Sequence, residues 1–236
     1  MDHFAWSRPR IYRVRTLRVA VTAVVIVVSA AVVSADALWD HAIEMLQASK
    51  HLVPASVVTR IEEMNADGRL RSTQETHIRF QVINDELIPQ IISKIQNGET
   101  IDPETIDGAT NASAAQFSEV FDADLASISA ATRDGQQRTI RGQKTINYRI
   151  EEPIEQYTLK GQVWISEQGV PLDLEYTVDP LPRAVRRLVI HTSYYLQDGY
   201  AVIGEMVTEV AVNVSIFFRR LYRISVRSED YFDPNT

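Results

Sequence analysis

Hydrophobic positions recur with a period of two residues through the second half of the chain. Tyr148, Leu174 and Ile190 stand within three runs in which apolar residues alternate with polar ones. Such alternation is typical of strands with one buried face and one solvated face. Turn sequences such as Glu167-Gln168-Gly169 and Asp198-Gly199 separate the runs. Because tight turns join neighbouring runs, the pattern predicts an antiparallel meander.

The first part of the chain combines a helical pattern with a hairpin pattern. Apolar residues recur every three or four positions between Leu38 and Leu46, which predicts a short amphipathic helix. The runs 56–64 and 70–82 then flank an Asp67-Gly68 pair. Since Asp-Gly readily adopts the positive backbone angles of a tight turn, these two runs are predicted to pair as a hairpin.

A second helix is predicted between Asn84 and Gly98. Asn84 is a preferred N-cap residue, Pro89 suits a first turn, and four isoleucines with Leu87 can share one helix face. From residue 98 to about 124, Asp, Thr, Ala and Ser then predominate, which indicates a mobile surface insertion.

These elements predict an α+β fold in which the sheet is wider than its helices can cover. Roughly eight or more strands at about 4.8 Å spacing make a sheet about 38 Å wide, and two helices about 10 Å across cover about half of it. The sheet is therefore expected to curl into a half-barrel around the helices. The space between is either a pocket for an apolar ligand or, if the insertion fills it, an ordinary core. The residues expected to line such a pocket are Leu172, Leu174, Tyr176, Leu188, Ile190, Tyr194 and Met206.

The N-terminus has the pattern of an export signal. Five arginines between Arg8 and Arg18 precede an apolar run over 19–35, and Ala35-Asp36-Ala37 closes the segment. This order of basic, apolar and small residues is typical of a secretory leader over 1–37, removed after Ala37 or Ala35. Since a spanning helix needs roughly 17 residues, an uncleaved membrane anchor is the alternative. The protein is accordingly expected in the periplasm, free or tethered to the inner membrane.

Length and composition indicate that residues 38–236 form one domain, and they make some classes of partner unlikely. Its 199 residues suffice for a single core that buries about 70% of the unfolded chain's surface. It has 19 basic and 29 acidic residues, a formal charge of −10, which disfavours nucleic acid. The chain has no cysteine, so disulfides, thiolate metal sites and a cysteine nucleophile are excluded.

No reaction signature is found in the sequence. The five histidines lie in no metal-binding pattern, and neither a nucleophile elbow nor a phosphate-binding glycine cluster occurs. The adjacent pairs Glu62-Glu63 and Glu151-Glu152 point to opposite faces of their strands, so neither can act as an acid and base pair. We therefore expect no enzymatic activity, no metal and no cofactor.

A row of basic residues near the C-terminus is a candidate binding surface. Arg219, Arg223 and Arg227 share one face of a predicted strand, and three more arginines lie between 183 and 187. Such a set can hold anionic lipid head groups or a negatively charged partner. The alternative is a solvated outer face on an acidic protein.

The order of elements resembles that of the outer-membrane lipoprotein-sorting family, the LolA/LolB-like periplasmic carriers. The resemblance rests on the run from Tyr157 to Ile165, on Gly169-Val170-Pro171, on Asp179-Pro180-Leu181-Pro182 and on the run 217–222. It implies a curved antiparallel sheet that wraps around helices and encloses a cavity for lipoprotein acyl chains, without catalysis. A lipid or acylated lipoprotein is then the expected ligand. The alternative function is an envelope sensor or assembly protein that binds another protein through its outer face.

The leader gives the first testable prediction. Protein recovered from the periplasm of an exporting host should begin at Asp36 or Leu38, as read by intact mass and N-terminal sequencing. A membrane-bound product that retains residues 1–35 would instead establish the anchor.

Overall fold

The computed structural model describes residues 36–84, 86–102, 128, 131–154, 156–213 and 219–235. The chain divides into two compact units, Met1–Ser34 and Ala35–Thr236, and every described residue belongs to the second. The predicted leader therefore lies outside the described residues except for Asp36 and Ala37. Within the described ranges, no helix is both long enough and apolar enough to cross a membrane.

The described residues form one helix, α1, and eleven strands that all belong to one antiparallel sheet. Their bounds are α1 Ala37–Ala48, β1 Val53–Asn65, β2 Leu70–Ile83, β3 Glu86–Gln96, β4 Glu99–Ile101, β5 Ala131–Ile140, β6 Gln143–Ile154, β7 Tyr157–Ser166, β8 Pro171–Asp179, β9 Val185–Gln197, β10 Tyr200–Asn213 and β11 Arg219–Phe232.

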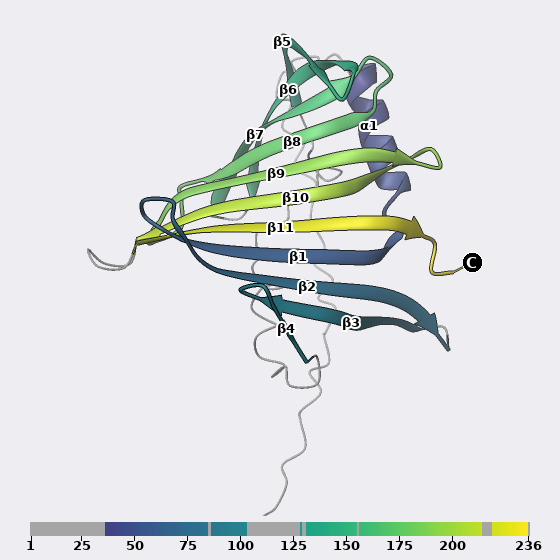
Figure 1. Ribbon diagram of the computed structural model, residues 1–236. Helices are drawn as coiled ribbons and strands as arrows, with labels where there is room; N and C mark the ends of the chain where they lie inside the picture. Colours follow the sequence, from purple (N-terminus) through teal and green to yellow (C-terminus); the bar gives the residue numbers. More distant parts are fainter. Residues whose placement is uncertain are drawn as a thin grey trace, which may run out of the picture. The chain divides into compact units, whose positions relative to one another are not determined.

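The strand order confirms the predicted meander and adds one non-local join. Strands β5 to β11 are neighbours in chain order, β1 pairs with β11, and β2, β3 and β4 follow outward from β1 (Figure 1). The predicted hairpin is β1–β2, closed around Asp67-Gly68. The sheet is curved, as expected of a half-barrel, but the fold is mostly β rather than α+β.

The predicted second helix is wrong, because residues 86–96 form β3. Isoleucine is β-branched and packs well on a pleated sheet, so the isoleucine-rich run favours a strand. Asn84 and Asn97 both have positive φ, and they belong to the tight turns before and after β3. Pro89 is tolerated because β4 pairs only with the far end of β3 and leaves the edge at Pro89 open.

The first residues of the predicted mobile insertion form a strand instead. Residues 99–101 form β4, a short edge strand paired with the end of β3. The rest of the predicted insertion, from residue 103, lies outside the described residues.

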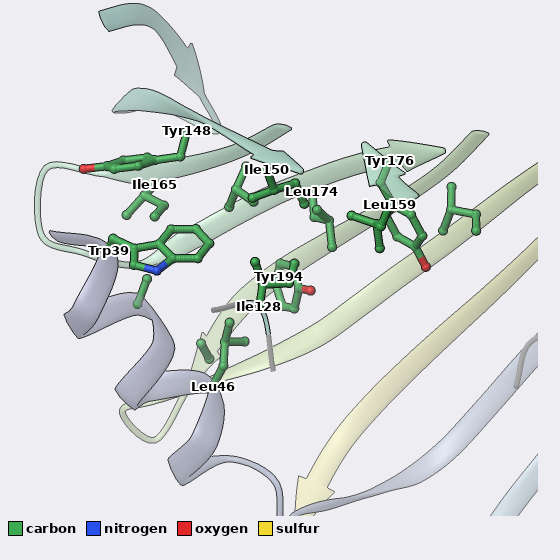
Figure 2. Close-up of a cluster of buried hydrophobic side chains, with 14 of the residues drawn as sticks. Trp39, Leu46, Ile128, Tyr148, Ile150, Leu159, Ile165, Leu174, Tyr176 and Tyr194 are labelled. Carbon is green, nitrogen blue, oxygen red and sulfur yellow. The ribbon is translucent and has the colours of Figure 1, made fainter. Parts of the chain in front are cut away.

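The first helix is confirmed, and one side of it packs on the sheet. Asp36 caps it by accepting a hydrogen bond from the Leu38 amide at 3.1 Å. Trp39, Ala42 and Leu46, spaced three and four residues apart, are its buried residues. The Trp39 ring lies 5.8 Å from the ring of Tyr148 on β6 (Figure 2). The sheet face that contacts α1 is called the inner face below.

The pairing between neighbouring strands identifies which residues lie on the inner face from β6 to β3. Directly paired residues of neighbouring strands lie on the same face. One such row starts at Tyr148, under the helix, and runs from β6 to β3 without a break. It comprises Tyr148, Val163, Leu174, Thr192, Met206, Val226, Thr59, Thr76 and Lys94.

Helix α1 covers only part of this face. Eleven strands at about 4.8 Å spacing span about 48 Å, whereas a helix is about 10 Å across. The buried cluster accordingly draws its sheet residues from β6 to β10. The strands from β11 to β4 contribute no residue to that cluster, so the described helix leaves their inner face without helical cover.

The close packing of β7 on β8 gives a test of the fold. A Cβ at Gly161 would lie 2.6 Å from the Tyr176 Cβ and overlap the Glu175 carbonyl oxygen. We expect Gly161→Ala to lower the free energy of unfolding by about 1–3 kcal/mol, as measured by urea denaturation. Gly204→Ala is the control, because its nearest neighbour is a tyrosine ring atom at 3.0 Å rather than backbone. Equal stability of the two variants would contradict this packing.

Candidate functional site

The residues predicted to line a ligand pocket lie mainly in the core beneath α1. Leu174, Tyr176, Leu188, Ile190 and Tyr194 belong to the buried cluster, each at most 3% exposed. Figure 2 draws Leu174 and Tyr194 on the side of the sheet that carries Trp39 and Leu46 of the helix. They are in contact with other side chains here, and a ligand-lining role for them stays a prediction.

The other two predicted lining residues lie at the margins of the cluster. Leu172 is buried but outside it, because a register shift between β7 and β8 falls beside Leu172 and breaks the alternation there. Met206, on β10, is partly buried and packs against the cluster from the side nearest β11. Met206 therefore marks the boundary between the covered and the uncovered part of the inner face.

Beyond Met206 the inner face carries partly exposed apolar side chains beside polar ones. The row from Met206 continues through Val226 and Thr59 to Thr76 and Lys94, which are buried at 7% and 5% exposed. Val226 pairs with Met206, and Ile224 and Ile61 continue the row that includes Ile190 and Thr208. We call this surface the open half of the inner face; its residues are Val57, Ile61, Ile78, Ile224 and Val226. All five are partly exposed. Aliphatic side chains that stay in contact with water at the centre of a sheet are a surface that can bind an apolar ligand.

The exposed apolar surface extends to the β2–β3 turn. Val82 and Leu87 pair across this hairpin on the inner side and are 41% and 40% exposed. An open hollow of about 1100 Å³ is lined by Val82 with Phe80, Tyr231 and Phe232, and by polar residues that include Asp230, Asp233 and Asn235. The hollow beside the open half of the inner face therefore combines apolar and polar groups.

The three predicted arginines lie on the outer face of β11, and all are exposed. Arg219 and Arg227 are eight residues apart, which along a strand is about 27 Å. A single head group cannot bridge that distance. The structure therefore separates the row into two places, one at the beginning of β11 and one in the middle of the sheet.

Arg227 belongs to a hollow of about 560 Å³ on the outer face of β10, β11, β1 and β2. Small side chains, Ser56, Val58 and Ser225, contribute to its lining, together with long charged side chains of both signs. The charged residues are Arg60, Arg79, Arg227, His77, Glu75, Glu205 and Glu229. Their charges nearly balance, so the hollow suits a polar partner rather than a strongly charged one.

A charged cluster on the outer face of β8 could not be found from the sequence. Asp173 accepts a hydrogen bond from Arg138 at 2.8 Å, and Arg141 donates to the carbonyl oxygens of Leu172 at 2.6 Å and Tyr194 at 2.7 Å. Arg138 also lies over the Trp164 ring, 4.1 Å from its centroid. The two carbonyl groups bound by Arg141 lie at the end of the short paired segment of β8 and β9. The cluster therefore stabilises the pairing of these two strands.

The described residues contain no group of three or more His, Asp or Glu side chains that could hold a metal ion. His191, which lies against Asp173, serves this pairing of β8 and β9. The Asp173 Oδ2 lies 3.8 Å from the His191 Nε2, and this neighbouring carboxylate raises the pKa of His191 above the usual 6.5, against the opposing effect of burial.

Comparisons with known proteins add little. No protein-family model matches the chain, and no curated protein matches it. The chain is similar to a DUF1329 family protein from Desulfovibrio piger ATCC 29098, known from a crystal structure at 1.75 Å resolution. The two share 14% identity over 81% of this chain and 92% of that chain, with a TM-score of 0.38. At that score the similarity supports no inference about this protein.

The raised pKa of His191 predicts a pH effect on stability. The protonated ring is favoured in the folded state, so its contribution is complete below pH 6.5 and is lost as the pH rises through the folded-state pKa. Because the side chain is 42% exposed, we expect a loss below about 1 kcal/mol. Urea denaturation across this pH range measures it. His191→Gln should flatten the profile, and an unchanged profile in that variant would contradict the assignment.

Proposed function

We propose that the protein is a non-catalytic periplasmic binding protein for a lipid or for the acyl chains of lipoproteins, acting in outer-membrane lipoprotein sorting or transport. The observation that supports this proposal is the open half of the inner face. There the row from Ile190 of the core continues to Ile224 and Ile61, and the described helix does not cover these two residues.

The energetics of burial favour a flexible apolar ligand at this surface. An acyl chain gains about 0.8 kcal/mol for each methylene that it buries. Ten buried methylenes would supply about 8 kcal/mol, which corresponds to micromolar affinity. The surface needs no directional hydrogen bond for such a ligand, which agrees with the aliphatic character of Val57, Ile61, Ile78, Ile224 and Val226.

The sequence resemblance to the lipoprotein-sorting family agrees with this proposal. The family's curved antiparallel sheet is broadly matched by the described strands. The proposal differs from the sequence-based expectation in the location of the ligand. We place it beyond Met206, over β11, β1 and β2, because the predicted residues on β8 and β9 are packed beneath α1.

A variant pair tests the proposed site. Val226→Glu places a charge on the open half of the inner face, whereas Ser225→Glu places the same charge one residue away on the outer face. Since burying an uncompensated carboxylate is costly, Val226→Glu should weaken binding of an acylated peptide by about tenfold or more. Ser225→Glu should leave it unchanged. Fluorescence titration with a labelled acylated peptide measures both.

Two results would contradict the proposal. One is the absence of bound lipid, by native mass spectrometry, in protein purified without detergent, together with no affinity for the acylated peptide. The other is equal binding by the two glutamate variants. Thermal unfolding checks that both variants are folded, and Val226→Trp, which adds bulk without charge, provides a second obstruction of the same site.

The hollow that contains Arg227 favours a second candidate function, an envelope sensor or assembly protein that binds another protein through its outer face. Its mixed charges fit a polar protein surface. Pull-down from envelope extracts with Arg79→Ser and Arg227→Ser distinguishes the two functions. Loss of a specific partner, with acyl binding intact, would favour the sensor.

A further inference from the structure

The ends of the strands near the β8–β9 connection carry an unusual concentration of arginine. The connection contributes Arg183, the second and third residues of β9 are Arg186 and Arg187, and β11 begins with Arg219 and Arg220. The segments 179–187 and 219–223 together hold six arginines and a single acidic residue. This density contrasts with the net charge of −7 for the whole chain.

Backbone contacts hold these arginines in one place. The Asn213 amide at the end of β10 donates to the Ala184 carbonyl at 2.8 Å, and Asn213 is the direct partner of Arg219. The β8–β9 connection and the beginning of β11 therefore meet at the same end of the sheet, at the left in Figure 1. We call this region the arginine end; its residues are Leu181, Arg183, Arg186 and Arg219.

Three acidic side chains near the arginine end are engaged by cations. Asp179 binds Lys160 at 2.6 Å, Glu209 binds Arg187 at 3.0 Å, and Glu63 binds Arg220 at 2.8 Å. By contrast, Arg183, Arg186 and Arg219 are exposed and form no ion pair with a carboxylate of the described residues. Three guanidinium groups are thus available to an outside anion.

The same connection carries an exposed apolar side chain two residues before Arg183. Leu181 is 36% exposed and stands between Pro180 and Pro182, whose rings restrict the backbone on both sides. Arginines around an exposed leucine on a stiff loop match the interface of a bilayer, where anionic head groups lie directly above acyl chains. A soluble anion would make no use of the leucine.

We propose that the arginine end docks the protein on a membrane surface that contains anionic phospholipids. Arg183, Arg186 and Arg219 bind the phosphate groups, and Leu181 enters the head-group layer. Docking through this end goes beyond the proposed acyl site, because it uses different residues and holds whether or not that site is occupied.

A pair of fluorescent labels tests the orientation. The chain has no cysteine, so Leu181→Cys and Gln168→Cys each give a single labelling position. Gln168 is exposed in the β7–β8 turn, at the opposite ends of the strands. With an environment-sensitive dye on the full chain, only the label at 181 should shift to shorter wavelength on phosphatidylglycerol-containing vesicles. Neither should shift on phosphatidylcholine vesicles.

Charge variants then test the arginines. In the Leu181→Cys background, changing Arg183, Arg186 and Arg219 to Gln should weaken vesicle binding by about tenfold or more. The same arginines changed to Lys should retain binding. The control changes Arg133, Lys144 and Arg149 to Gln, which removes the same charge elsewhere on the sheet and should have little effect.

Three results would overturn docking through this end. They are no response of the label at 181, an equal response of both labels, and an equal loss of binding in the two Gln triples. Acylated-peptide affinity, measured on the same variants, should be unchanged by the first triple. Failure of docking is thereby distinguished from failure of the acyl site, and circular dichroism confirms that each variant is folded.

Discussion

One continuous antiparallel register constrains everything else in the described structure. Because paired residues share a face, the side of the sheet that packs on α1 at β6 is the same side that carries Val226 on β11 and Ile61 on β1. The apolar character of that side is fixed by alternation along each strand. The described helix is too narrow to cover it all, so the same face is core beneath α1, whereas its other half carries apolar residues that are only partly buried.

Local patterns in the sequence were sufficient to predict much of this sheet. Asp67-Gly68 specifies its hairpin through backbone angles, and the alternation around Leu174 and Ile190 places these residues in the core. The prediction failed in a segment whose apolar residues fit both the period of a helix and that of a strand. In 84–98, the apolar spacing suits a helix face, and only β-branching and the asparagine turns favour a strand.

Contacts between residues that are far apart along the chain could not be predicted from the sequence. Arg141 reaches the Tyr194 carbonyl 53 residues away, and Arg138 reaches Asp173 at a separation of 35 residues. The β1–β11 pairing likewise joins the two ends of the domain, and it brings Ile61 beside Ile224. Neither residue stood out in the sequence, and each acquires its importance from the partner that the fold provides.

The two surfaces proposed as functional differ in chemistry and in position. The open half of the inner face is aliphatic and lies along the middle of the strands, whereas the arginine end is cationic and lies at their termini. A protein that accepts acyl chains from a membrane needs both an apolar surface and a way to approach the bilayer. On an acidic domain, a local group of arginines supplies that approach without changing the overall charge.

The most direct test of the central claim is photo-crosslinking with a fatty acyl probe that carries a diazirine near its terminal methyl group, followed by peptide mapping. The account predicts adducts on the inner face of β11, β1 and β2, centred on Val226, Ile61 and Ile78. Adducts confined to the outer face, or no adducts above those of a water-soluble diazirine, would contradict it.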